Sequence, residues 1–174
     1  MKSGYKLLCE EARREDASGS SREGMAELWS RIWKLKVLGK ILHFLWKACT
    51  YCLPTKVNLM KRRIVDDSHC EPCGRLPEDT KHALWSCEAV RRVWCMDFNW
   101  VTEGMTAYGS FLDLVELCLT KPGAGELFGI TAWLIWTHRN KVTLREKTIP
   151  LSSIGEAAKK FLQQEKAARD FREV

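Results

Sequence analysis

Three cysteines and one histidine stand at the spacing C-x2-C-x8-H-x4-C near the middle of this 174-residue chain. Cys70 and Cys73 are followed by Gly74, which permits a tight turn where two thiolates chelate one side of a metal ion and backbone amides point at the sulfurs. His82 would supply the third ligand from the start of a helix, and Cys87 the fourth where that helix ends or bends. Sulfur and nitrogen ligands in this pattern predict a tetrahedral Zn²⁺ site.

Four protein ligands leave no position for water or substrate, so the predicted zinc is structural and is no Lewis-acid catalyst. Structural zinc binds peptides with apparent energies of about 10–16 kcal/mol, which exceeds the stability of many domains. The local fold over residues 68–95 should therefore depend on the metal. Asp79 or Thr80 is placed to cap the helix that begins near His82.

Other ligand sets compete with this assignment. A four-cysteine ribbon spacing is formed by Cys49, Cys52, Cys70 and Cys73. Its first pair lies in a helical pattern and is followed by no glycine, which disfavours it. His69 could replace His82, but it sits directly beside Cys70, and a chain without metal is a further alternative. The remaining cysteines are predicted to be ordinary or buried thiols: Cys9, Cys95 and Cys118.

The composition suits one ordinary domain, or a small module with a helical extension, because 45% of residues are hydrophobic and 29% are charged. The uncharged run at residues 127–138 is shorter than the roughly 20 residues that span a membrane, so no membrane segment is expected. The first sixteen residues contain no apolar segment for secretion. We therefore expect an intracellular, nuclear or cytoplasmic protein whose eight cysteines are metal ligands or thiols.

Helical spacing of apolar residues predicts a mainly α fold. One helix is expected over residues 40–52, ending before Pro54, and Thr55 can cap a short second helix. The residues expected to face inward from that second helix are Val57, Met60 and Ile64. Beyond Trp100 about three more helices are expected, broken at residues 121–123 and 149–150, the last of them packing weakly.

These patterns divide the chain into three parts. Residues 10–27 are charged and rich in Ser and Gly, as in a flexible linker. We therefore predict a flexible N-terminal segment over 1–27, a small zinc-stabilised helical module over 28–100, and a helical extension over 101–174.

Positive charge is concentrated in residues 28–65, which contain nine cations and no acidic residue. Aromatic residues are interleaved with these cations, a mixture that suits a polyanion such as nucleic acid. Alternatively, the cations lie on solvated helix faces whose aromatics point inward. The cations predicted to bind nucleic acid are Lys34, Lys36, Lys40, Lys47, Lys56, Lys61, Arg62 and Arg63.

Ordered matches to a known family extend over about residues 3–95. They include Trp29-Ser-Arg-Ile-Trp33, Lys40-Ile-Leu-His43-Phe44-Leu-Trp46, Leu53-Pro54-Thr55, Cys70-Glu-Pro-Cys73-Gly74 and His82-Ala-Leu-Trp85-Ser-Cys87. These residues resemble the zinc-binding domain that follows the polymerase in plant LINE-type (non-LTR) retrotransposon reverse transcriptases. Ala132-Trp-Leu-Ile-Trp136 and Arg139-Asn140 resemble the stretch that follows this domain, whereas Leu38-Gly39 departs from the family's usual pair of prolines.

The resemblance implies a zinc-stabilised helical accessory module that assists a reverse transcriptase with nucleic acid. It carries over the ligand set Cys70, Cys73, His82 and Cys87. It also marks the aromatic residues Trp33, Phe44, Trp46, Trp85 and Trp94, which the residue pattern places mostly in the core.

Motifs for catalysis are missing from the sequence. A polymerase needs paired carboxylates that hold two Mg²⁺ ions, and the only Asp pair, Asp66-Asp67, precedes the cysteine pair in what reads as a solvated loop. We therefore expect no enzyme and no small-molecule substrate, but a zinc-binding module of retroelement origin that binds RNA or DNA. The alternatives are an adaptor that docks on a polymerase or another protein partner, exposing apolar surface around Trp133 and Trp136, or a relic fragment without selected function.

Overall fold

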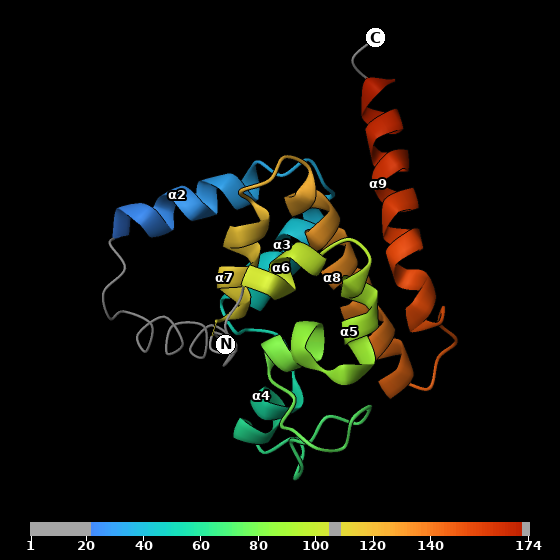
Figure 1. The fold of residues 1–174 in the computed structure, drawn as a ribbon. Helices are drawn as coiled ribbons and strands as arrows, with labels where there is room; N and C mark the ends of the chain where they lie inside the picture. Colours follow the sequence, from blue (N-terminus) through green and yellow to red (C-terminus); the bar gives the residue numbers. More distant parts are fainter. Residues whose placement is uncertain (1–21, 105–108, 172–174) are drawn as a thin grey trace, which may run out of the picture.

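The computed structural model describes residues 22–104 and 109–171, which form helices joined by short connections (Figure 1). In chain order the elements are α2 (Arg22–Trp33), α3 (Gly39–Cys49), α4 (Lys56–Lys61), the π-helical turn η1 (His82–Ser86), α5 (Glu88–Cys95), α6 (Asn99–Gly104), α7 (Phe111–Cys118), α8 (Ala124–Thr143), the 3₁₀ turn η2 (Leu151–Ser153) and α9 (Ile154–Asp170). An isolated β-bridge joins His69 to Pro77. The predicted mainly α fold is confirmed, and the described residues form no β-strand.

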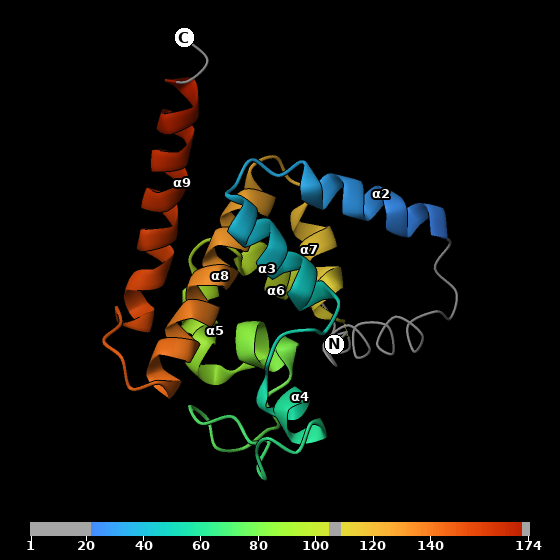
Figure 2. The same cartoon turned by 180° about the vertical axis from the view of Figure 1, so that it is seen from behind.

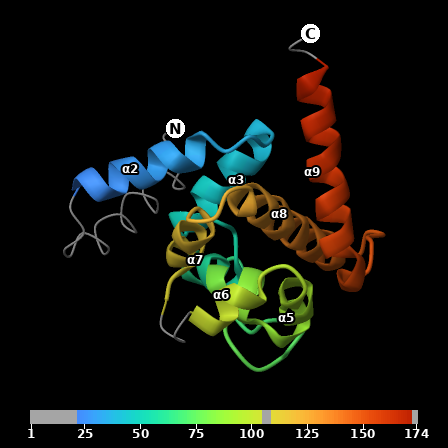
Figure 3. The same ribbon diagram turned by 45° about the horizontal axis from the view of Figure 1, so that its top comes forward.

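Helix α8 organises the hydrophobic core, because α3, α7, α9 and η1 all contact it (Figures 1 and 3). Phe128 lies at the centre of an aromatic cluster and is 1% exposed. Its ring centroid lies 4.8 Å from Trp94, 5.6 Å from Phe98, 5.7 Å from Phe111 and 6.1 Å from Trp85. The η1 turn and α5 are therefore anchored to α8 by large buried rings.

A glycine permits the close contact between α3 and α8. A Cβ atom at Gly129 would lie 2.9 Å from Cδ1 of Leu45, which is itself fully buried in a closely packed core. The small residue therefore lets the two helices approach closely.

The two predicted N-terminal helices are present as α3 and α4, and the cap of α4 is as expected. Thr55 Oγ1 accepts a hydrogen bond from the Asn58 backbone N–H at 3.3 Å. The inward orientation predicted for α4 is wrong, because Val57 is only half-buried, Met60 is 42% exposed and Ile64 is 62% exposed. This six-residue helix has no buried side chain and is held instead by polar contacts at its start.

The remaining helices follow the predicted breaks, with two differences. Helices α7, α8 and α9 are separated at residues 119–123 and 144–153, whereas the short α6 gave no sequence signal. Helix α2 begins at Arg22, so residues 22–27, expected to be part of a flexible linker, are helical. The rest of that segment, residues 1–21, lies outside the described residues.

Helix α9 packs through its first half. Ile154 and Ala158 are buried, and the Phe161 ring lies 5.9 Å from the Trp133 ring of α8. Its second half extends past the other helices (Figure 2), where Arg169 contacts the Lys36 carbonyl and Phe171 is 85% exposed. Among the described helices, none is both long and apolar enough to cross a membrane.

Candidate metal centre

The side chains of Cys70, Cys73, His82 and Cys87 converge on one point. Their ligand atoms all lie within 4.8 Å of one another. Sγ of Cys70 lies 3.7 Å from Sγ of Cys87, and Sγ of Cys73 lies 3.3 Å from Nε2 of His82. Zn–S bonds of about 2.3 Å and Zn–N bonds of about 2.0 Å in a tetrahedron give S···S and S···N separations of roughly 3.8 and 3.5 Å. The donor set and its spacing therefore fit a closed zinc site.

The first two ligands lie in a tight turn that we call the knuckle, residues 68–78. Gly74 has φ +62°, a conformation that glycine adopts without strain. The backbone N–H of Cys73 donates to the Cys70 sulfur, and the N–H groups of Arg75 and Leu76 donate to the Cys73 sulfur. The predicted arrangement, with amides directed at the sulfurs, is present.

The other two ligands are placed by η1. Oδ1 of Asp79 accepts the backbone N–H of His82 at 2.6 Å, so Asp79, one of the two predicted caps, fills that role. The Cys87 N–H donates to the His82 carbonyl at 3.1 Å, which is the i to i+5 bond of a π turn. The helix then ends at Cys87, whose φ of −62° and ψ of 132° are extended. This π turn is wider than an α turn and brings His82 and Cys87, five residues apart, to the same side. The sequence predicted that the helix ends or bends at Cys87 but did not predict the π turn.

The three site thiols differ in their proton affinity. Burial raises the pKa of the Cys70 thiol to about 12 and also raises the pKa of Cys87. The N–H groups of Arg75 and Leu76 stabilise the thiolate of Cys73 and lower its pKa to about 6. At neutral pH, a metal ion would therefore displace protons from Cys70 and Cys87 and meet an existing thiolate at Cys73.

The competing ligand sets are not assembled. The metal-ligating cluster formed by the described residues contains neither Cys49 nor Cys52, and Cys49 is buried in the hydrophobic core on α3. His69 is exposed and turned toward Asp67, with 2.5 Å between its Nδ1 and the Asp67 Oδ1. Of the cysteines expected to be ordinary thiols, Cys118 is buried, Cys95 is exposed and Cys9 lies outside the described residues.

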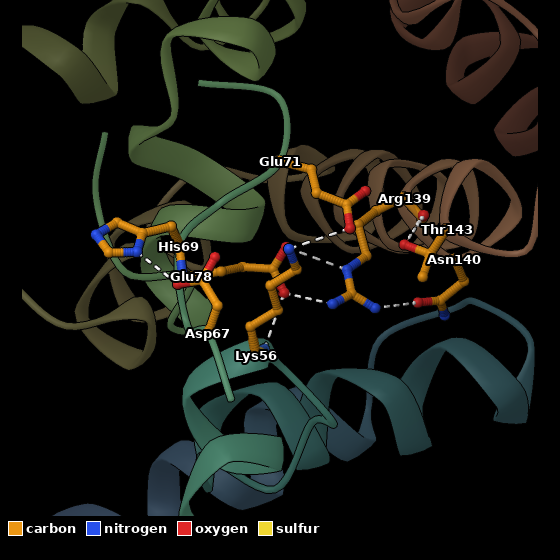
Figure 4. A network of polar contacts seen from close by, with 8 residues as sticks. All are labelled: Lys56, Asp67, His69, Glu71, Glu78, Arg139, Asn140 and Thr143. Carbon is orange, nitrogen blue, oxygen red and sulfur yellow. Dashed lines mark hydrogen bonds and ion pairs between the residues drawn. The ribbon is translucent and has the colours of Figure 1, made fainter. Parts of the chain in front are cut away.

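A buried ion pair lies beside the knuckle and was missed by sequence reasoning (Figure 4). Glu78 and Arg139 form a salt bridge with side chains only 3% and 14% exposed. Arg139 belongs to α8, 61 residues away in the sequence. The sequence distinguished Arg139 as the residue that ends the uncharged run at 127–138 and as part of the Arg139-Asn140 resemblance, but it gave no sign of the pairing with Glu78.

The cations predicted to bind nucleic acid fall into separate groups. Lys34 and Lys36 in the α2–α3 connection and Lys40 in the first turn of α3 are exposed. Lys61 ends α4, and Arg62, which is half-buried, and Arg63 follow it. Helix α4 lies at the opposite end of the molecule from that connection (Figures 1 and 2). Lys47 and Lys56 are half-buried. The Nζ of Lys56 forms a salt bridge with Glu71 at 3.1 Å.

The aromatic residues mostly lie inside, as the residue pattern predicted. Phe44 and Trp94 are buried, and Trp46 and Trp85 are half-buried. Trp33 differs, since it is 49% exposed at the end of α2.

The apolar surface expected around Trp133 and Trp136 is not present. Trp136 is 7% exposed, and Trp133 is covered by Phe161 of α9 and by Lys40, whose Nζ lies 4.4 Å from the ring centroid. The aspartate pair behaves as predicted, because Asp66 and Asp67 are exposed in the loop before the knuckle.

Comparison with known families gives one result. A family model described as zinc-binding in reverse transcriptase matches residues 1–94. The chain belongs to this family. The matched range includes all four candidate ligands and ends within α5, so α7, α8 and α9 lie beyond it. Searches of curated proteins and of solved structures found no match. Family membership and the Cys₃His cluster together identify a zinc-binding module.

Proposed function

We propose that this chain is a non-catalytic accessory module of LINE-type retroelement origin, built around structural zinc, which binds RNA or DNA. The observation that carries the proposal is the closed cluster of Cys70, Cys73, His82 and Cys87. A zinc ion held by these four ligands has no free coordination position for water or substrate, which argues for a structural role.

The first group of cations, Lys34, Lys36 and Lys40, supports binding of a polyanion. Helix α9 reaches this group, because Nη1 of Arg169 donates to the Lys36 carbonyl and Lys40 Nζ lies 5.9 Å from the Phe161 ring. A cation from the C-terminal extension therefore joins cations from the family-matched region. Half-exposed Trp33 precedes Lys34 and offers a ring face on which a base could stack.

Binding of the full chain to single-stranded and duplex RNA and DNA, measured by filter binding at two salt concentrations, tests the proposal. Phosphate contacts release counterions, so log Kobs should fall with log salt by about 0.7–0.9 per contact. Affinity that does not change with salt would contradict phosphate binding.

Two variants compare the separate groups of cations. The triple variant K34Q/K36Q/K40Q removes the first group, and K61Q/R63Q removes exposed charge at the end of α4. We expect the first variant to reduce the salt slope by about two to three units and the second to have a smaller effect. Zinc content and thermal midpoint are the controls for folding. Equal losses in the two variants would contradict the assignment to the first group.

An adaptor function is the second candidate, favoured by apolar exposure at the C-terminal end of α8. Val142 is 46% exposed, Leu144 67% and Ile149 43%. Such a surface on a polymerase accessory module would dock on the polymerase or another protein. Sedimentation velocity tests this: self-association that disappears in L144E supports it, and a monomer at every concentration counts against it.

A further inference from the structure

Arg139 and Glu78 form a buried, two-pronged ion pair between α8 and the knuckle. Nε of Arg139 donates to Oε2 of Glu78 at 3.2 Å, and Nη2 donates to Oε1 (Figure 4). Both side chains are largely removed from water, so either charge would be costly without the other. The pair therefore acts as a unit.

Glu78 lies in the chain between the two ligand pairs of the metal site, Cys70 with Cys73 and His82 with Cys87. Its backbone N–H donates to the Ser68 carbonyl at 2.7 Å, which closes the base of the knuckle that carries Cys70 and Cys73. The next residue, Asp79, caps the turn that carries His82 and leads to Cys87. The position of Glu78 therefore sets the relation between the first and second ligand pairs.

Glu78 also fixes the start of α4. Its Oε1 accepts the Lys56 backbone N–H at 3.0 Å, and its carbonyl accepts the Val57 N–H at 3.2 Å. The same carboxylate oxygen receives a hydrogen bond from Arg139. Through the Glu78 carboxylate, Arg139 of α8 is thus linked to α4, to the knuckle and to the turn that Asp79 caps.

A small cleft lies between part of the metal site and α8. Cys70 and Cys87 line it on the site side, and Ile135 and Val142 line it on α8. Glu78 and Arg139 line the same cleft. The ion pair crosses this cleft and adds a polar link between α8 and the knuckle to the ring contacts that join η1 and α5 to α8.

Arg139 is itself held in orientation. Its Nη1 donates to Oδ1 of Asn140 at 3.0 Å, and its guanidinium carbon lies 5.0 Å from the centroid of the Trp136 ring. A planar guanidinium presents two parallel donors to a carboxylate, which an ammonium group does not. A lysine in its place would keep the charge and lose the two-pronged contact.

We propose that Arg139 is a positioning residue of the zinc site, acting through Glu78, although it lies 45 residues beyond the end of the family-matched range. The inference rests on the zinc binding stated above. Residues that orient metal ligands from outside the coordination sphere typically change metal affinity by about 10–100-fold when they are replaced. Loss of Arg139 should therefore release the metal faster while all four ligands remain.

The experiment uses the full zinc-loaded chain mixed with an excess of a chromogenic chelator, and it measures the rate of zinc release. R139Q and E78Q should release zinc about 10–100-fold faster than the unmodified chain, and R139K should be intermediate. The control R92Q makes the same chemical change at an exposed site on α5 and should release zinc at the original rate.

A second control separates positioning from general stability. I130V trims a fully buried side chain of α8 and lowers global stability with the ion pair intact. The absorption spectrum of the Co²⁺-loaded chain gives an independent readout, because it reports the arrangement of the sulfur and nitrogen ligands. We expect the spectrum to change in R139Q and E78Q and to remain unchanged in I130V and R92Q.

The outcomes are distinguishable. If the unmodified chain binds no zinc, the proposed metal module fails and this inference fails with it. If the unmodified chain binds zinc but R139Q and E78Q match it in release rate and Co²⁺ spectrum, the positioning role alone is overturned. The positioning role is also overturned if I130V, at an equal loss of thermal stability, releases zinc as fast as R139Q and E78Q do. Should R139Q not fold, E78Q and R139K provide the same comparison.

Discussion

The knuckle and the helical core around Phe128 are stabilised in different ways. In the knuckle most side chains are exposed, among them Glu71, Arg75 and Leu76, while the thiols of Cys70 and Cys73 turn toward the metal site. In the core, large rings and aliphatic side chains exclude water almost completely. A segment with few apolar contacts of its own needs another source of stability, which a metal ion held by the four ligands would supply. The comparison predicts that each region responds to a different perturbation.

Loss of a metal ligand should have the largest effect. C87S should abolish binding of one zinc per chain, because three remaining ligands cannot close the tetrahedron, and about 10–16 kcal/mol of metal-binding energy is at stake. Elemental analysis measures the zinc, and hydrogen exchange should show lost protection in residues 68–95 with protection retained in α8. C95S, at an exposed cysteine, is the matched control. Equal zinc content in the two variants would refute the assigned ligand.

Removal of the central ring should affect the core first. F128A creates a cavity among Trp85, Trp94, Phe98 and Phe111, and buried Phe to Ala changes cost about 3–5 kcal/mol. Chemical denaturation of the zinc-loaded chain measures this loss. F171A changes a ring that is 85% exposed and should leave stability unaltered. If F128A costs less than about 1 kcal/mol, the cluster is not the centre of the core.

Most of the helices and the cluster of three cysteines and one histidine were predictable because they depend on local sequence. Thr55 marks a cap through the hydrogen bond it makes three residues on, and Gly74 after Cys73 marks the turn that ligand chemistry requires. Chelation restricts which donors can belong together, so the four ligands could be selected from eight cysteines and four histidines.

The remaining features depend on contacts between residues distant in the sequence. The pairing of Glu78 with Arg139 spans 61 positions, and Lys40 covers a tryptophan on α8. Likewise, α4 is held by hydrogen bonds from Lys56 and Val57 to Glu78, more than 20 positions away, and Met60 is left exposed. Periodicity shows that a helix has an apolar side, but it does not show what covers that side.

The pH dependence of zinc affinity should report the site thiols. Zinc binds thiolates, whereas Cys70, with a pKa of about 12, and Cys87, whose pKa is also raised, hold protons in the metal-free fold at pH 7. Each displaced proton lowers affinity about tenfold for every unit by which pH falls, so these thiols predict about a hundredfold loss from pH 8 to pH 7.

Chelator competition at several pH values measures this slope. Cys73, whose pKa is lowered to about 6, should add a third proton only below that pH. If binding of one zinc ion releases fewer than one proton between pH 7 and pH 8, the assignment of Cys70 and Cys87 as ligands is contradicted.

The core thiols should show the opposite pH dependence and the smallest effect. Burial raises the pKa of Cys118 to about 12, from about 9 for an exposed thiol. Its contribution to stability is therefore complete below about pH 9 and declines as pH rises toward 12, by about 1.4 kcal/mol at pH 10. Denaturation at pH 8 and pH 10 should show a smaller decline in C118A than in the unmodified chain. C95A should decline as the unmodified chain does, and identical declines in all three would exclude the effect.

The π turn has a consequence for insertions and deletions. His82 and Cys87 are joined by the i to i+5 bond of η1, and a residue added or removed between them would rotate Cys87 by roughly 100° about the helix axis. Related chains should therefore keep four residues between this histidine and this cysteine, whereas length changes should accumulate in connections such as residues 144–150, which contain no ligand.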